Sequence, residues 1–219
     1  MNGNVKYHDP YKTHSQTVSS KGGRKPEVFN GKCISIGSDT HHIEILKNVV
    51  HDCTGNGIGG TGGSDYILVA GNEVYNTGWY TSDGGHAITF KNLKSIDQFT
   101  GAKVIIRNNY LYSNWNYLIS CSTQKKFVHM AVDEGKGIHC QDSTGSGKWK
   151  YGIVSIKDNV VVRTGNAGMT TNAVDRARIE NNLLVDNGWY QLMYDQGVLD
   201  PAIEKKDTPP LYPGGFRVA

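Results

Sequence analysis

Short stretches of alternating apolar and polar residues recur along the chain, and five of them align on a single asparagine each. An apolar or small residue lies five positions before that asparagine, three before it and two after it. Such alternation predicts a β-strand with these residues on its inner side, and the change of parity at the asparagine predicts a bend between two strands. The aligned asparagines are Asn48, Asn72, Asn109, Asn159 and Asn182.

The constant phase of the repeat predicts stacked coils. We expect the asparagine side chains to form a ladder of hydrogen bonds from coil to coil. Hairpins in a β-sandwich are the alternative, but they would not keep one phase across five copies. The residues expected to point inward are Ile43, Ile45, Val50, Ile67, Val69, Val74, Val104, Ile106, Leu111, Val154, Ile156, Val161, Ala177, Ile179 and Leu184.

A third strand follows each pair, at residues 33–37, 57–62, 86–91, 137–142 and 168–173. Its inward residues are predicted to be Ile34, Ile58, Ile88, Ile138 and Met169. One outward column is then Ser35, Gly59, Thr89, His139 and Thr170, and the next is Gly37, Thr61, Lys91, Gln141 and Asn172.

These patterns predict an all-β, right-handed parallel β-helix of about six coils with an asparagine ladder. We expect a single domain over 1–219, with an irregular N-terminal segment (1–31), coils over 32–196 and a C-terminal tail (197–219).

The spacing between strands is uneven. Asn48 to Ile58 takes 10 residues, whereas Asn109 to Ile138 takes 29; the return leg grows from 9 residues (Ile34 to Ile43) to 16 (Ile88 to Val104). Long ordered loops usually serve a function. We therefore expect a groove over strands 86–91 and 137–142. Its predicted walls are residues 77–85 and 115–135 on one side and 92–101 and 143–152 on the other.

Composition and charge limit the classes of binding partner that we expect. The 219 residues carry 27 glycines and a net charge of +3, which suits a solenoid and weakly favours an acidic partner. We expect neither nucleic acid nor membrane as a partner, because the chain has no basic stripe and no apolar run of spanning length. The N-terminus has no signal-peptide core. The four cysteines (Cys33, Cys53, Cys121, Cys140) lack CxxC spacing, and we expect buried small side chains in preference to disulfides.

Several strings resemble the pectate-lyase-like parallel β-helix proteins, particularly extracellular bacterial members. The matching strings are Thr40-His41-His42-Ile43 through His51-Asp52, Asp65-Tyr66-Ile67 through Asn72, Glu134-Gly135-Lys136-Gly137-Ile138-His139-Cys140-Gln141-Asp142, and the ending Asp200-Pro201 to Phe216-Arg217. The resemblance implies a secreted, carbohydrate-active protein. It departs from the family pattern at Glu134, Lys136 and Gln141. The family includes lyases, hydrolases, epimerases and binders, so the reaction stays open.

β-Elimination of a uronate requires neutralisation of the substrate carboxylate and a base that removes the proton from the adjacent carbon. Lys91 and His139 lie outward on adjacent predicted strands and are the expected catalytic residues, with Lys136 as an alternative base. A solvated strand-end lysine is the alternative reading of Lys91.

Carboxylates bracket the same strand. Asp133, Glu134 and Asp142, with Asp97, offer the oxygen ligands that suit Ca²⁺, which is the implied cofactor. Capping of turns is the alternative role of these residues. A glycoside hydrolase is the rival enzyme, with Glu134 paired with Asp142 or Asp97.

Aromatic and polar side chains are expected to bind the sugar rings, although aromatic residues in loops also cover cores. The predicted substrate-binding residues are Trp79, Tyr80, His86, Thr89, Trp115, Tyr117, Gln141 and Trp149. The sequence thus favours a lyase acting on an acidic polysaccharide. A glycoside hydrolase and a non-catalytic carbohydrate-binding β-helix are the alternatives, and the oligomeric state is open.

Overall fold

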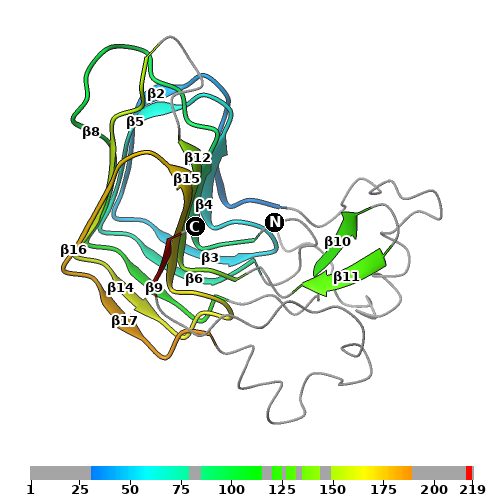
Figure 1. Ribbon diagram of the computed structural model, residues 1–219. Coiled ribbons are helices and arrows are strands. Elements are labelled where there is room, and N and C mark those ends of the chain that lie inside the picture. Colours follow the sequence, from blue (N-terminus) through cyan, green and yellow to red (C-terminus); the bar gives the residue numbers. More distant parts are fainter. Residues whose placement is uncertain are drawn as a thin grey trace.

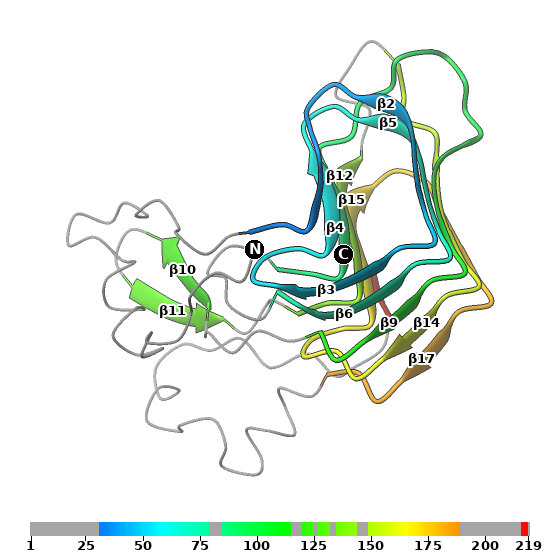
Figure 2. The ribbon, with the colours of Figure 1, turned by 180° about the vertical axis from the view of Figure 1, so that it is seen from behind.

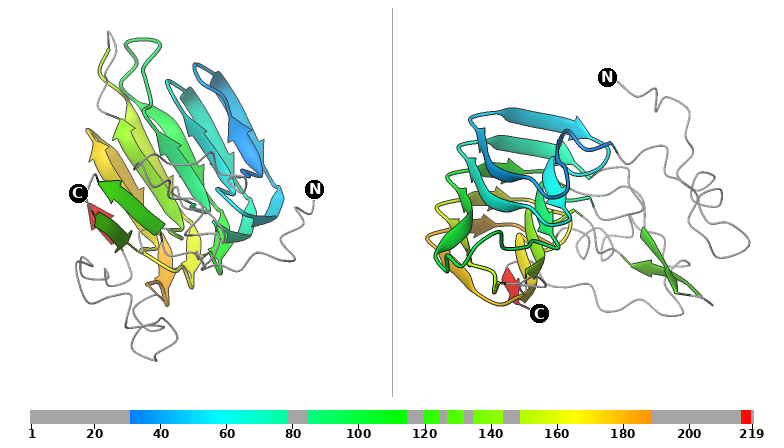
Figure 3. Two further views of the ribbon diagram at one scale, coloured as in Figure 1. Left: turned by 90° about the vertical axis from the view of Figure 1, so that its right-hand side faces the viewer. Right: turned by 90° about the horizontal axis from the view of Figure 1, so that it is seen from above.

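The computed structural model describes residues 31–78, 85–114, 135–143 and 149–188, together with the backbone of strands at 120–124, 127–131 and 216–218. Within these ranges every regular element is a β-strand, and no helix is long and apolar enough to cross a membrane. The chain winds into coils whose successive strands run side by side in chain order (Figures 1 and 3).

Three parallel sheets form the coils, which confirms the predicted parallel β-helix. The first sheet contains β1 (Ile34–Ile36), β4 (Ile58–Thr61), β7 (Ile88–Lys91), β12 (Ile138–Ser143), β15 (Met169–Val174) and β18 (Phe216–Val218). The second contains β2 (His41–Leu46), β5 (Asp65–Ala70), β8 (Ala102–Arg107), β13 (Ile153–Lys157) and β16 (Ala177–Glu180). The third contains β3 (Val49–Cys53), β6 (Glu73–Thr77), β9 (Tyr110–Tyr112), β14 (Val160–Val162) and β17 (Leu183–Val185). An antiparallel hairpin of β10 (Ser120–Gln124) and β11 (Phe127–Ala131) forms a separate sheet.

The asparagine ladder is present over all five predicted positions. Each side-chain Nδ2 donates to the Oδ1 of the next asparagine, from Asn48 to Asn182, at 2.9–3.0 Å. Each Oδ1 from Asn72 onward also accepts the backbone N–H of the preceding ladder residue. The ladder therefore satisfies the polar groups at the corner between the second and third sheets.

The bend at this corner is made by the residue just before each ladder asparagine. The residue before each ladder asparagine has a φ between 52° and 67°, in the left-handed region. This region favours Gly, Asn and Asp. The five residues concerned are Lys47, Gly71, Asn108, Asp158 and Asn181.

A second polar ladder, which the sequence analysis missed, lies where the third sheet ends. Asn114 accepts from the N–H and hydroxyl of Thr77, and Asn187 accepts in the same way from Thr164. At this turn the asparagine side chains accept hydrogen bonds from the backbone N–H and the hydroxyl of a threonine in the neighbouring coil, in place of a backbone carbonyl.

The core follows the predicted parity. The inward residues of the middle coils, such as Ile67, Val104 and Ile156, are buried. At the two ends the same columns are less covered, so Ile43 and Ile179 are only partly buried and Ala177 is exposed.

The prediction for the cysteines was partly wrong. Cys33 and Cys53 form a disulfide, with their Cα atoms 5.6 Å apart, which joins the start of the first coil to the end of β3. Cys140 is a free, buried thiol as expected, and burial raises its pKa to about 12. The side chain of Cys121 lies outside the described residues.

Candidate functional site

The outer face of the first sheet brings together several predicted site residues from adjacent coils. Strands β7 and β12 pair in the predicted register, with Thr89 opposite His139 and Lys91 opposite Gln141. Strand β15 continues the first of these columns with Thr170. The strand parity that placed these side chains on one face is thus confirmed.

His139 is fixed by two hydrogen bonds on this face. Its Nδ1 lies 2.6 Å from Thr170 Oγ1, and its Nε2 donates to Gln141 Oε1 at 3.0 Å. Because both ring nitrogens have protein partners, this arrangement orients His139 and, through it, the amide of Gln141. The sequence analysis placed Thr170 in the same outward column as His139 but did not name it as a site residue.

His86 and Lys136 lie at the corner just before β7 and β12. The rings of His86 and His139 meet edge to face with centroids 4.8 Å apart. The backbone N–H of His86 donates to Asn56 Oδ1 at 2.8 Å. Burial lowers the pKa of His86 well below its usual value, and the positive charges of Lys136, His139 and Lys91 lower it further. His86 is therefore neutral near pH 7.

We call His86, Thr89, Lys91, Lys136, His139, Gln141 and Thr170 the cationic cluster. Most of it is covered: His86, Thr89 and His139 are 2%, 1% and 6% exposed. Lys91 and Gln141 are only half-buried, so they are the members that a large ligand reaches most readily. The buried hydroxyl of Thr89 has no hydrogen-bond partner.

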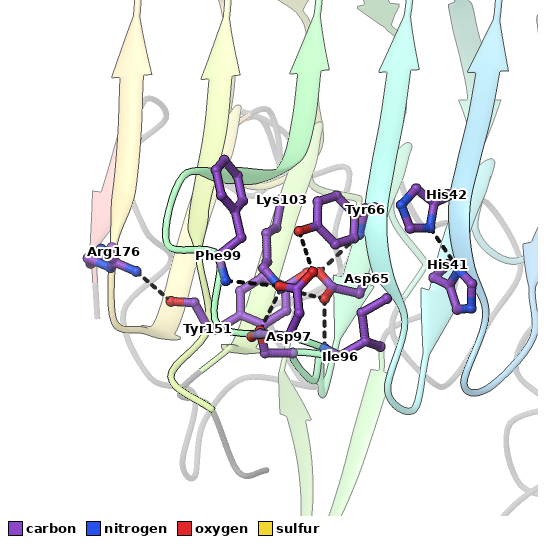
Figure 4. A network of polar contacts seen from close by, with 11 residues as sticks. His41, His42, Asp65, Tyr66, Ile96, Asp97, Phe99, Lys103, Tyr151 and Arg176 are labelled. Atoms are coloured by element: carbon purple, nitrogen blue, oxygen red, sulfur yellow. Dashed lines mark hydrogen bonds and ion pairs between the residues drawn. The ribbon is translucent and has the colours of Figure 1, made fainter. Parts of the chain in front are cut away.

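Asp97 does not belong to the cationic cluster. It lies in the loop of residues 92–101, where its carboxylate accepts from Lys103 Nζ at 2.8 Å and from the hydroxyl of Tyr66 at 2.7 Å (Figure 4). These hydrogen bonds lower the pKa of Asp97 to about 2. The carboxylate is thus committed to a partner on the second sheet.

Lys103 is the centre of this polar network. Its side chain is fully buried, and Nζ donates to Asp65, Ser95 and Asp97 at 2.6–2.8 Å. Burial alone would lower the pKa of Lys103, but the bonds to Asp65 and Asp97 outweigh burial and raise it. An ammonium group with three acceptors is fully satisfied, so the network anchors the loop.

The predicted wall at 92–101 was therefore wrong. The loop's side-chain bonds run to Asp65, Tyr66 and Lys103, and in Figures 1 and 2 it projects at β8, on the side opposite the β10–β11 hairpin. Its length correctly indicated an ordered insertion, but length carries no information on which sheet the insertion covers.

The predicted calcium ligands are not brought together by the described residues. Asp142 is partly exposed at the corner after Gln141 with φ 52°, whereas Asp97 is held by Lys103. In the described part of the chain, no three His, Cys, Asp or Glu side chains gather to hold a metal ion. Asp133 and Glu134 lie outside the described residues.

The predicted aromatic contacts mostly fall outside the described ranges. These residues are Trp79, Tyr80, Trp115 and Tyr117. Trp149 is half-buried in the segment that leads to β13, while the neighbouring Tyr151 is fully buried, with its ring centroid 5.9 Å from Lys103 Nζ.

These observations define a parallel β-helix protein with a cluster of lysine and histidine side chains on the outer face of its first sheet. Comparison with known proteins finds no matching family model, no matching curated protein and no matching solved structure.

Proposed function

We propose that the protein binds an acidic polysaccharide at the cationic cluster and cleaves it by β-elimination. The observation that carries this proposal is the convergence of Lys91, Lys136 and His139 around buried His86. Such a site attracts a carboxylate and opposes its negative charge.

The chemistry requires one proton transfer and one bond cleavage. Lys91 in its uncharged form takes the proton from the carbon next to the uronate carboxylate. The electron pair left behind forms a carbon–carbon double bond, and the glycosidic oxygen on the neighbouring carbon departs and takes up a proton from water. Lys91 suits this role because it is half-buried and reachable. Lys136, whose charge acts on neighbouring His86, adds to the positive charge of the site.

His139 is a positioning residue in this proposal. With Gln141 Oε1 held by His139, the amide nitrogen of Gln141 is free to turn toward the sugar beside Lys91. Loss of the imidazole would release Gln141 and weaken substrate binding together with turnover. In this proposal the lysines oppose the charge of the substrate carboxylate, since both lie close enough to His86 to act on it electrostatically.

The disulfide supports secretion, since disulfides persist in oxidising compartments. A hydrolase is less well supported, because the carboxylate of Asp97 is held by Lys103 and by the hydroxyl of Tyr66. Carbohydrate binding without cleavage is the second candidate, and the low exposure of Thr89, His139 and Thr170 favours it.

A substrate screen tests the proposal. Acidic and neutral polysaccharides are incubated with the protein while ultraviolet absorbance of unsaturated ends and the release of reducing ends are both followed. A lyase produces both signals. Reducing ends without absorbance indicate hydrolysis, and binding by affinity electrophoresis without either signal indicates a binding module.

A further inference from the structure

The long loop of residues 92–101 serves a different place from the cationic cluster. Its Asp97 bonds to Tyr66 and Lys103, which belong to the second sheet and line a cavity of about 260 Å³. Lining residues include His42, Glu44, Tyr66, Leu68, Lys103 and Ile105. This volume lies slightly below the roughly 300–1,000 Å³ of pockets for drug-sized ligands, which suits a single ring rather than a chain segment.

The floor of this cavity is apolar. Register places Glu44, Leu68 and Ile105 side by side on β2, β5 and β8, with their side chains on the outer face. Leu68 and Ile105 are only partly buried, and Glu44 is exposed beside them. Two aliphatic side chains bordered by one carboxylate form an amphipathic surface.

The aromatic wall is held rigidly. The ring of Tyr66 stacks on His42 with centroids 4.6 Å apart, and its hydroxyl donates to Asp97. Lys103 Nζ lies 4.7 Å from the centroid of the Tyr66 ring. The bonds of Asp97 to Tyr66 and Lys103 thus fix one wall of the cavity, which is the preorganisation expected of a binding site.

Charge decides the ligand class. Among the lining residues Glu44 is exposed, whereas Lys103 is fully buried and bonded to Asp65 and Asp97, so an incoming ligand meets the carboxylate of Glu44. A uronate is repelled there, in contrast to the cationic cluster. The apolar face of a sugar ring fits Leu68 and Ile105, while its hydroxyls reach Glu44 and His42.

We propose that this cavity is a second carbohydrate site, which binds one non-acidic sugar ring. The choice of a sugar rests on the proposed carbohydrate function, but the site is separate from the cationic cluster and does not need cleavage. The sugar comes either from the same polysaccharide that reaches Lys91 or from another glycan.

Ligand-observed saturation-transfer NMR tests the site on the full chain. The probes are methyl glycosides of neutral hexoses in the gluco, galacto and manno series, with the matching amino sugars and uronates. We expect transfer to at least one non-acidic sugar. Transfer to a uronate reports the cationic cluster and should persist in Leu68→Asp. Leu68→Asp should raise the dissociation constant roughly tenfold or more, because a second carboxylate enters the floor.

Leu46→Asp is the matched control, since Leu46 is 41% exposed two positions beyond Glu44 and outside the cavity. It should bind as the parent does. The proposal is overturned by a uronate signal that is lost in Leu68→Asp, by unchanged binding of non-acidic sugars in Leu68→Asp, or by no binding of any non-acidic sugar to the parent.

Lys91→Ala separates this site from the proposed lyase activity, because it should leave sugar binding here unchanged. Failure of the cleavage screen therefore leaves this binding test intact. If acidic polymer is cleaved, a higher KM in Leu68→Asp shows that both sites hold one chain, and an unchanged KM shows that the second site takes a separate glycan.

Discussion

Lys103 Nζ lies 2.7 Å from Asp65 Oδ2, and neither side chain has any exposed surface. Both are on the second sheet, on adjacent strands of two coils. The carboxylate of Asp65 also accepts the backbone N–H of Ile96 and of Tyr66. The pair therefore connects β5 and β8 with the loop inserted between β7 and β8.

Lys103→Met should destabilise the protein by about 3–5 kcal/mol, because it leaves the carboxylate of Asp65 buried without its cation. Lys157→Met is the control: Lys157 pairs with Asp158 at 3.9 Å on the exposed surface, and its loss should cost about 1 kcal/mol or less. Urea unfolding followed by circular dichroism measures both. Equal effects in the two variants would contradict a special role for the buried pair.

Asn109→Ala should also be strongly destabilising. Asn109 is 2% exposed, and its side chain donates to Asn159 and Val69 and accepts two N–H groups of Asn72. Leaving these buried groups unpaired costs about 1–3 kcal/mol each before relaxation. Asn48→Ala, at the exposed end of the ladder, should have a clearly smaller effect. A loss at Asn48 as large as that at Asn109 would show that the middle of the ladder has no added importance.

The ladder and the strand parity were predictable because both are set by local pattern. Period-two alternation fixes which residues face inward, and the left-handed corner favours Gly, Asn or Asp just before the ladder asparagine, as at Gly71, Asn108 and Asp158. Because the five copies of the repeat keep the same phase, the coils can stack in essentially one register.

The disulfide and the loop contacts were not predictable in the same way. Cys33 and Cys53 are 20 residues apart, and only the path around the first coil brings their Cα atoms to 5.6 Å. The partnership of Lys103 with Asp65 depends on register between coils. The sequence did contain one signal for that pair. Asp65 lies seven positions before Asn72, and Lys103, of opposite charge, lies six positions before Asn109, the next ladder asparagine.

Reduction of the Cys33–Cys53 disulfide should lower stability by about 3 kcal/mol, as expected for a closed loop of this length. Cys33→Ser should have a similar effect. In a Cys121→Ser background, native protein should react with a thiol reagent only after unfolding, because Cys140 is buried with a pKa raised to about 12. Rapid reaction of the native thiol would contradict the burial of Cys140.

The neutral state of His86 makes stability depend on pH. Its pKa in the folded protein lies well below the unfolded value of about 6.5, chiefly because the ring is buried. Below that value the unfolded chain binds a proton that the folded protein does not, so stability falls as pH decreases, by up to about 1.4 kcal/mol per pH unit. The bonded carboxylate of Asp97, with a pKa of about 2, acts in a separate window that begins below about pH 4.

His86→Gln should flatten this dependence below about pH 6.5, whatever its effect on stability at pH 7. His41→Gln, at an exposed position on β2, should keep the slope of the parent. Urea midpoints measured across this range decide the matter. An unchanged slope in His86→Gln would show that other groups cause the acid dependence.

Lys91 offers the sharpest test of the proposed chemistry. It could bind the substrate carboxylate through its charge or remove the proton as the base, and different substitutions separate these two contributions. Lys91→Ala should abolish β-elimination and change the melting temperature little, since the side chain is half-buried at the end of β7. Lys91→Arg keeps the positive charge but not the base, because a guanidinium does not lose its proton. It should therefore retain KM while kcat falls about 10²–10⁴-fold. Lys94→Ala, three residues further along at an exposed position, should behave as the parent does. Full kcat in Lys91→Arg would assign the base to Lys136 and leave Lys91 only the binding of the carboxylate.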